Sequence, residues 1–119
     1  MTSLVNYELN ESVATITLDD GKVNVLGPAM QTAINEALDR AEKDDAKAVV
    51  LAGNQRVFSG GFDLSVFQSG DPQAALAMLA GGFELSVRCL TFPKPVIITR
   101  RSHSLPMFRL SRRKASLPK

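Results

Sequence analysis

The stretch that decides the fold is Val57-Phe58-Ser59-Gly60-Gly61-Phe62-Asp63-Leu64. It places a glycine pair and an acid between an apolar run and the start of a helix. The preceding run, Ala48–Ala52, is short, continuous and partly β-branched, which is typical of a fully buried strand in a parallel sheet. Asp63 is a preferred N-cap residue, so a helix is predicted to begin directly after it. The segment therefore predicts a strand, a turn and a helix in succession.

The glycine pair has two interpretations. Adjacent glycines permit positive φ and allow other atoms to approach the backbone closely. A tight turn that leads into a helix leaves several N–H groups without partners, and such groups can bind an anion or a developing oxyanion. The alternative is a glycine-rich turn that only changes the direction of the chain.

The residues before this stretch predict a hairpin followed by a helix. Residues 5–9 and Val13–Leu18 alternate in character, with a turn expected at Asn10-Glu11. Ala14, Ile16 and Leu18 share one face of the second strand. Pro28 suits the first turn of a helix that ends near Lys43, and this helix has apolar residues at helical spacing, namely Met30, Ala33, Ile34, Ala37, Leu38 and Ala41.

The residues after Asp63 predict a second long helix. Asp71 suits its N-cap and Pro72 its first position. Its apolar residues form one stripe, made of Leu76, Leu79, Ala80, Phe83, Val87 and Leu90. Gly81 and Gly82 interrupt the helix at a cost of about 1 kcal/mol each relative to alanine, which suggests close packing of another element against them.

Three segments resemble the crotonase (enoyl-CoA hydratase/isomerase) superfamily. Residues 58–64 are similar to its Phe-Ser/Ala-small-Gly-x-Asp-Leu/Ile motif. Lys22-Val23-Asn24-Val25-Leu26 resembles the family loop that lies along the CoA moiety, and residues 93–97 resemble a Pro-Lys-Pro-Val-Ile segment that enters a buried strand. The resemblance covers residues 13–99. It implies an α/β fold, as an incomplete crotonase-like ββα spiral with an irregular basic C-terminal tail.

The resemblance also implies a site and a chemistry. The family hydrates or isomerises enoyl-CoA thioesters, using two backbone N–H groups as an oxyanion hole and one or two Glu residues as general acid and base. It assigns the Gly60 N–H as one catalytic oxyanion donor. It implies substrate contacts at Lys22, Val23, Val25, Gly60, Gly61, Phe62 and Asp63. A second glycine-rich turn and the catalytic carboxylates follow in the family and do not follow Thr99 here.

We therefore expect a family protein that acts on acyl-CoA thioesters but is inactive as this chain. The alternative is a non-catalytic fragment or an interaction module. The family helix that corresponds to the second long helix borders the acyl pocket, so room for an acyl chain is a second interpretation of Gly81 and Gly82. Glu84 matches no catalytic position of the family and is expected on an exposed helix face. Cys89 is expected to be an inert helix residue.

Composition sets the expected surroundings and partners. Cys89 is the one cysteine, which suits a reducing, cytoplasmic compartment, and no signal peptide is apparent. No apolar run approaches the roughly 18 residues of a membrane span, so no membrane partner is expected. We expect no metal and no cofactor other than CoA as part of the substrate. The resemblance implies relatives that assemble as homotrimers or hexamers.

Charge divides the chain into two parts. Residues 1–99 hold twelve acidic and seven basic residues, a net −5, whereas residues 100–119 hold seven basic residues and no acid. We expect residues 1–99 to be the N-terminal part of a crotonase-like domain. Residues 100–119 are expected to be a disordered or out-of-frame tail, rather than a nucleic-acid-binding arm. Within the tail, Arg112-Arg113-Lys114-Ala115-Ser116 resembles a basophilic kinase site.

Overall fold

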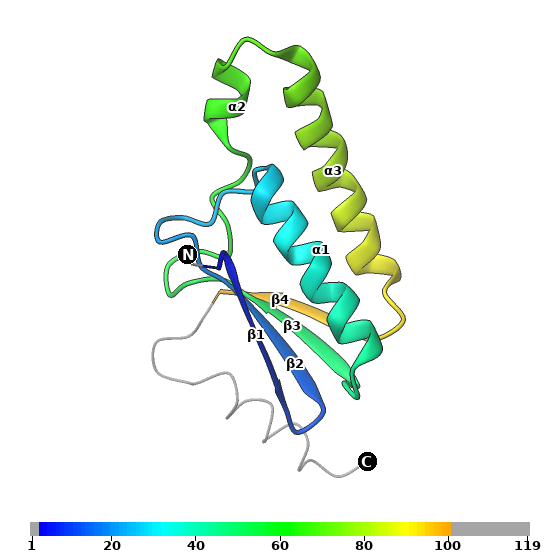
Figure 1. The fold of residues 1–119 in the computed structure, drawn as a ribbon. Helices are drawn as coiled ribbons and strands as arrows, with labels where there is room; N and C mark the ends of the chain where they lie inside the picture. Colours follow the sequence, from blue (N-terminus) through cyan, green and yellow to red (C-terminus); the bar gives the residue numbers. More distant parts are fainter. Residues whose placement is uncertain (1–2, 101–119) are drawn as a thin grey trace.

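The computed structural model describes residues 3–100, which form an α/β unit (Figure 1). Along the chain the elements are β1 (Val5–Asn10), β2 (Val13–Leu18), α1 (Pro28–Lys43), β3 (Ala48–Ala52), α2 (Leu64–Gln68), α3 (Pro72–Thr91) and β4 (Val96–Thr99). Their strands form a sheet in the order β1-β2-β3-β4, in which β1 and β2 are antiparallel and β2, β3 and β4 are parallel. Both long helices lie on one face of this sheet.

The hairpin forms as predicted, but its turn lies one residue later in the sequence than the predicted Asn10-Glu11. Ala14, Ile16 and Leu18 of β2 are fully buried, which confirms the predicted face. Asn10 pairs with Val13, so the loop consists of Glu11 and Ser12, whose φ angles are 53° and 70°. Two-residue hairpin loops favour positive φ at both central positions because this matches the twist of the strands.

Helix α1 packs its apolar face on the sheet. Met30, Ile34, Leu38 and Ala41 are each at most 2% exposed, as the spacing predicted. Its C-terminal end is held by a side chain from the segment before β4. The Lys94 Nζ donates to the carbonyl oxygens of Ala41, Glu42 and Asp44 at 2.8, 3.3 and 3.0 Å. A cation at this end satisfies free carbonyl groups and complements the helix dipole.

Helix α3 begins at Pro72 as predicted, and the Asp71 carboxylate accepts the N–H groups of Gln73 and Ala74. It buries Met78, Gly82 and Leu85, whereas the predicted apolar stripe faces outward. By length and composition alone its 20 residues could cross a membrane, so the prediction that no run is long enough was wrong. One such helix is weak evidence of a membrane span, and α3 packs against α1 on the side that holds Met78, Gly82 and Leu85.

The predictions for the basic tail concern residues that lie outside the described part of the chain, apart from Arg100. Arg100 directly follows β4, and its guanidinium donates to the Gln55 carbonyl at 2.7 Å. The assignments of residues 101–119 as disordered, out of frame or a kinase site remain predictions.

Candidate functional site: a glycine turn held by the Lys22–Leu26 loop

The loop after β2 is organised by one carboxylate. Asp20 accepts the N–H groups of Lys22, Asn24 and Val25 at 2.8, 2.9 and 2.9 Å. Burial acts to raise the pKa of Asp20, but the N–H groups of Asn24, Lys22 and Val25 outweigh it and hold that pKa below its usual value. The ionised carboxylate therefore fixes the backbone of the predicted CoA loop.

Asn24 then joins this loop to the glycine stretch. Its side chain is 1% exposed, and its backbone has a φ of 57°, which asparagine tolerates better than most residues. The amide Nδ2 donates to the Phe58 carbonyl at 3.2 Å, and the Asn24 carbonyl accepts the Ser59 hydroxyl at 2.6 Å. Two distant parts of the sequence are thus connected through one buried residue.

Backbone hydrogen bonds complete the connection. The Gly60 N–H donates to the Val23 carbonyl at 2.6 Å, and the Leu26 N–H donates to the Gly61 carbonyl at 2.7 Å. The two chains approach so closely at Gly60 that an added Cβ would lie 2.9 Å from Val23 Cγ2. The structure thus brings together the two segments in which the predicted substrate-binding residues lie.

The assignment of the Gly60 N–H as an oxyanion donor remains a prediction, and the structure shows a bond that competes with it. In this structure the Gly60 N–H donates to the Val23 carbonyl at 2.6 Å. The Gly61 N–H is also satisfied, because it donates to Ser59 Oγ at 3.0 Å. The physical reason is that the Lys22–Leu26 loop lies against the first glycine, a contact that the motif alone does not reveal.

The next amide along the turn has the required freedom. The Gly61–Phe62 peptide is trans, as no described peptide bond is cis, and its carbonyl points to the Leu26 N–H. In a trans peptide the N–H points opposite to the C=O, so the Phe62 N–H points away from the loop. Within residues 3–100 it has no acceptor. A φ of 97° at Gly61 makes this turn possible.

The other predicted site residues have structural roles. Asp63 caps α2, since its carboxylate accepts the Ser65 N–H at 3.0 Å and the Ser65 hydroxyl at 2.7 Å. Lys22 is exposed, and its carbonyl accepts the Asn54 side chain. Val23 is 43% exposed and Val25 is half-buried. Among residues 3–100 no three His, Cys, Asp or Glu side chains gather as a metal site would require.

The glycine pair of α3 serves close packing. A Cβ on Gly82 would lie 2.5 Å from Cε1 of the Phe62 ring, and a Cβ on Gly81 would overlap the Gln31 side chain. Both glycines are therefore closely packed, and Gly82 also lines an apolar cavity of about 290 Å³, so both interpretations of the pair stay predictions. Glu84 is exposed on the same helix, as predicted.

Sequence reasoning missed Gln31. This residue is 7% exposed, and its Nε2 donates to the carbonyls of Leu26 and Met78 at 3.1 and 2.9 Å. It thereby ties the end of the Lys22–Leu26 loop to α3. A glutamine beside an apolar stripe does not by itself indicate that its side chain is buried and joins two elements. Gly81, which packs against Gln31, was a partial indication that another element lies close to α3 at this point.

Comparison with known proteins identifies the family. A family model described as Enoyl-CoA hydratase/isomerase matches residues 8–102. A probable enoyl-CoA hydratase of Rhodobacter capsulatus is 44% identical over 61 residues, which are 50% of this chain and 23% of that protein. A peroxisomal bifunctional enzyme of Danio rerio is 33% identical over 108 residues, covering 72% of this chain and 15% of that one.

Solved structures agree with these matches. A probable enoyl-CoA hydratase from Mycobacterium tuberculosis superposes with a TM-score of 0.77 at 57% identity, over 80% of this chain and 40% of that chain. A Pseudomonas syringae protein of the enoyl-CoA hydratase/isomerase family superposes with a TM-score of 0.77 at 42% identity. This match covers 86% of this chain and 44% of that chain. The chain therefore spans less than half the length of these relatives. Within that span, its motif, its fold and the family match agree, and the chain belongs to the enoyl-CoA hydratase/isomerase (crotonase) family.

Proposed function

We propose that this chain binds acyl-CoA thioesters through the unit formed by the Lys22–Leu26 loop and the glycine turn, and that the Phe62 N–H is one donor to the thioester oxygen. The observation that carries the proposal is the orientation of this N–H. It points away from a loop that holds its own peptide carbonyl, and it lacks an acceptor within residues 3–100. A donor fixed in this way needs no reorganisation when a carbonyl oxygen gains charge.

The rigidity of the turn supports the assignment. Four hydrogen bonds join the loop to residues 58–61, and three more hold the loop to Asp20. The Phe62 ring is wedged against Gly82, which limits the movement of the residue that carries the donor. Oxyanion stabilisation depends on such preorganisation rather than on the strength of one hydrogen bond.

The loop supplies the proposed contact with CoA. Lys22 and Val23 are exposed at the edge of the same unit, and a lysine ammonium there would attract the phosphates of the nucleotide end. The relatives' names refer to enoyl-CoA hydratases, and acyl-CoA is proposed as the ligand here by that relationship and by the geometry of the turn.

The test compares variants at Phe62 by calorimetry with the full chain. Phe62→Pro removes the N–H, whereas Phe62→Leu keeps the N–H and removes the ring. We expect Phe62→Pro to weaken binding of a short enoyl-CoA by about tenfold, as for the loss of one hydrogen bond to a polarised oxygen, and Phe62→Leu to weaken it less.

Free CoA provides the second arm of the test. It lacks the thioester carbonyl, so its affinity should be unchanged by Phe62→Pro but reduced by Lys22→Ala. Equal losses for Phe62→Leu and Phe62→Pro would contradict the donor assignment. Failure of both enoyl-CoA and CoA to bind the folded chain would contradict the proposed function as a whole.

A second candidate function is a non-catalytic interaction module. The observation that favours it is the large exposed apolar area on α3 and β4, which is unusual for a free monomer. In that case the chain would bind a protein partner and would show no thioester-dependent affinity.

A further inference from the structure

The buried polar side chains within residues 3–100 both serve the Lys22–Leu26 loop. They are Asn24 and Gln31. Asn24 belongs to the loop and binds the Phe58 carbonyl, whereas Gln31 lies in the first turn of α1 and binds the loop from outside. Burying a polar group costs free energy unless its hydrogen bonds are made. The presence of both residues at one loop therefore indicates that the position of this loop matters.

The Gln31 amide bridges two backbone carbonyls. Its Nε2 donates to Leu26 at 3.1 Å and to Met78 of α3 at 2.9 Å. Carbonyl oxygens are acceptors only, so the amide nitrogen and not the amide oxygen must face them. The two N–H groups of Nε2 match the two acceptors in number. The bridge therefore requires a side chain that donates twice, which an ionised carboxylate of the same shape cannot do.

The bridge continues to the glycine turn through one residue. Leu26 accepts from Gln31 with its carbonyl and donates with its N–H to the Gly61 carbonyl at 2.7 Å. The Gly61 carbonyl and the Phe62 N–H belong to one planar peptide group, so the orientation of that group follows the position of Leu26. Gln31 thereby influences, through Leu26, the direction in which the turn presents its amides.

The turn contacts α3 a second time through a side chain. The Phe62 ring lies against Gly82, where an added Cβ would be 2.5 Å from Cε1, and the Gln31 amide lies against the neighbouring Gly81. The contacts thus close a ring, which runs from α3 through Gln31 and Leu26 to the turn and returns to α3. In such a ring the turn cannot shift along α3 unless one of these contacts breaks.

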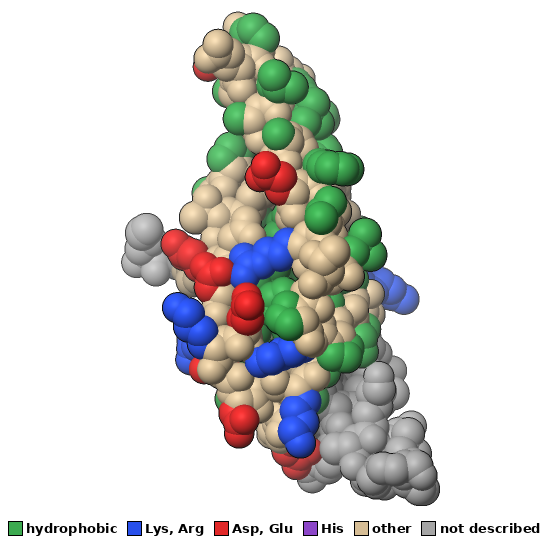
Figure 2. Space-filling model, turned by 90° about the vertical axis from the view of Figure 1, so that its right-hand side faces the viewer, with side chains coloured by type: hydrophobic (Ala, Val, Ile, Leu, Met, Phe, Trp, Pro, Cys, Tyr) green, Lys and Arg blue, Asp and Glu red, His purple; other side chains and the backbone are tan. Residues whose placement is uncertain are grey.

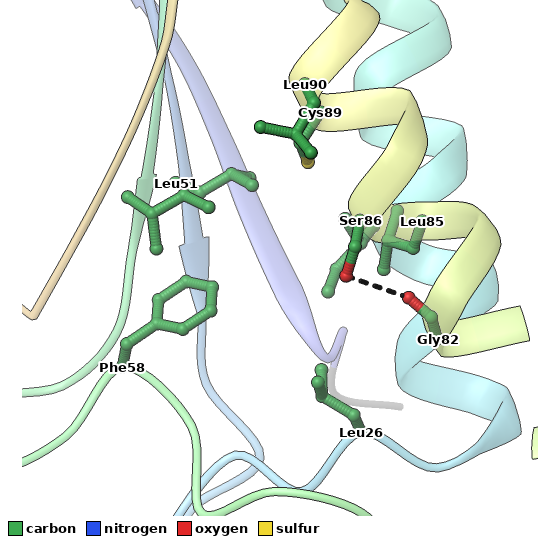
Figure 3. A pocket seen from close by; sticks show the side chains of 10 residues that line it. Leu26, Leu51, Phe58, Gly82, Leu85, Ser86, Cys89 and Leu90 are labelled. Carbon is green, nitrogen blue, oxygen red and sulfur yellow. Dashed lines mark hydrogen bonds between the residues drawn. The ribbon is translucent and has the colours of Figure 1, made fainter. Parts of the chain in front are cut away.

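Apolar packing is loose where Leu26 approaches α3. Leu26 and Gly82 both line a cavity of about 290 Å³ between α3 and the sheet (Figure 3). Atoms that line a cavity lack partners on one side, so they gain less from dispersion than atoms in a close-packed core. The outward side of α3 is exposed, and Figure 2 shows hydrophobic side chains there on the surface. Gln31 therefore supplies a fixed contact between Leu26 and α3 at a place where apolar packing does not.

We propose that Gln31 is a positioning residue for thioester binding, which holds the glycine turn at the distance from α3 at which an amide of the turn meets the thioester oxygen. The inference rests on the proposed function, because Gln31 acts on the same site without touching the ligand. A donor stabilises charge on a carbonyl oxygen best when its position is fixed beforehand. A small displacement of the turn should therefore weaken binding of the thioester carbonyl and leave binding of the rest of CoA unchanged.

The experiment measures the affinities of the full chain for a short enoyl-CoA and for free CoA by calorimetry, in the parent chain and in Gln31→Met. Methionine is similar in length to glutamine and adapts to its surroundings, but its side chain cannot donate. We expect Gln31→Met to weaken enoyl-CoA binding by about three- to tenfold and to leave CoA binding unchanged. A smaller folded fraction alone would lower both apparent affinities by the same factor.

Asn35→Leu is the matched control. Asn35 lies one turn after Gln31 on α1 and also joins this helix to α3, since its side-chain oxygen accepts from the Arg88 guanidinium at 2.9 Å. Its amide nitrogen donates to the Gln31 carbonyl within α1, so its hydrogen bonds do not reach the loop. The variant should leave the ratio of enoyl-CoA to CoA affinity unchanged.

Gly81→Ala tests the same bridge without altering Gln31. The added Cβ overlaps the Gln31 side-chain oxygen and should displace the amide, so the variant carries the test even if Gln31→Met does not fold. We expect it to lower enoyl-CoA affinity selectively. Combining it with Gln31→Met should add no further loss, because both variants act through one contact. Full additivity of the two losses would contradict the bridge.

Hydrogen exchange of the chain without ligand tests the position of the turn separately. In Gln31→Met the Leu26 N–H should exchange about tenfold faster, while the amides of β2 and β3 keep their rates. The proposal is overturned by equal losses for enoyl-CoA and CoA, by unchanged enoyl-CoA binding, or by the same selective loss in Asn35→Leu. A folded parent chain that binds neither ligand overturns the proposed function together with this role. Binding by the parent chain with unchanged Leu26 exchange in Gln31→Met overturns the role alone.

Discussion

The amide of Gly60 donates to the carbonyl of Val23 at 2.6 Å, and the two residues are so close that a side chain at Gly60 would overlap Val23. The first glycine of the turn therefore serves the contact between two loops. The second glycine provides the positive φ, and the Phe62 N–H that follows it has no acceptor within residues 3–100. This division of roles is the basis of the predictions for the turn.

Gly60→Ala should destabilise the chain by about 1–3 kcal/mol, because its Cβ would lie 2.9 Å from Val23 Cγ2. Urea denaturation measures the change in free energy of unfolding. Adding Val23→Ala to Gly60→Ala should recover part of the lost stability, since the atom nearest to the added Cβ belongs to the Val23 side chain. A double variant as unstable as the sum of the single ones would contradict the direct contact.

Stability should fall at low pH partly through Asp20. Its folded pKa lies below its unfolded value near 3.8, so its contribution is fully present above that value and is lost as the pH falls through the folded pKa. Asp20→Asn should therefore lower stability at pH 7 and have less effect at pH 2. Chemical denaturation at both pH values tests this. Asp19→Asn is the control, as Asp19 accepts one exposed N–H only.

Gly82→Ala should destabilise the chain even though alanine favours helix by about 1 kcal/mol. The added methyl would lie 2.5 Å from the Phe62 ring, and overpacking of this kind costs about 1–3 kcal/mol. Thermal melts of Gly82→Ala, with and without Phe62→Leu, measure the effect. If the single variant melts higher than the parent chain, the ring is not wedged against α3 as described.

Tyr7 should ionise only near pH 12. Burial raises its pKa to about 12, assisted by a 2.8 Å hydrogen bond from its hydroxyl to Asp44. A folded pKa above the unfolded value of 10.0 stabilises the fold below pH 10, and this contribution is lost as the pH rises through 12. Ultraviolet titration reports Tyr7 alone, because the chain has one tyrosine and no tryptophan. Asp44→Asn should lower the measured pKa.

The purified chain should show no measurable hydration of a short enoyl-CoA. The acids near the glycine turn have other roles. Asp63 caps α2 and Asp20 holds the loop. Loss of the conjugated thioester absorbance is the assay. Turnover above a protein-free blank that disappears in Phe62→Pro would contradict this prediction.

Local chemistry was sufficient for the sequence to determine the elements and the family. The signals that predicted the elements act within a few residues of the chain. They are the prolines at Pro28 and Pro72, the caps Asp63 and Asp71, and the alternation of β2. The predicted elements were therefore confirmed to within a residue or two. The motif at residues 58–64 identified the family because its glycines and acid follow one another directly in the chain.

Only the tertiary structure decided which amide of the turn is free and which face of α3 is buried. Both depend on residues far apart in the sequence. The Val23 carbonyl accepts the N–H of Gly60, and the side chains of Phe62 and Gln31 pack against the glycine face of α3. An apolar stripe shows that a helix face avoids water, but it does not say which partner covers it. The outward stripe of α3 is apolar enough to be a core face, and the elements within residues 3–100 pack on its other side.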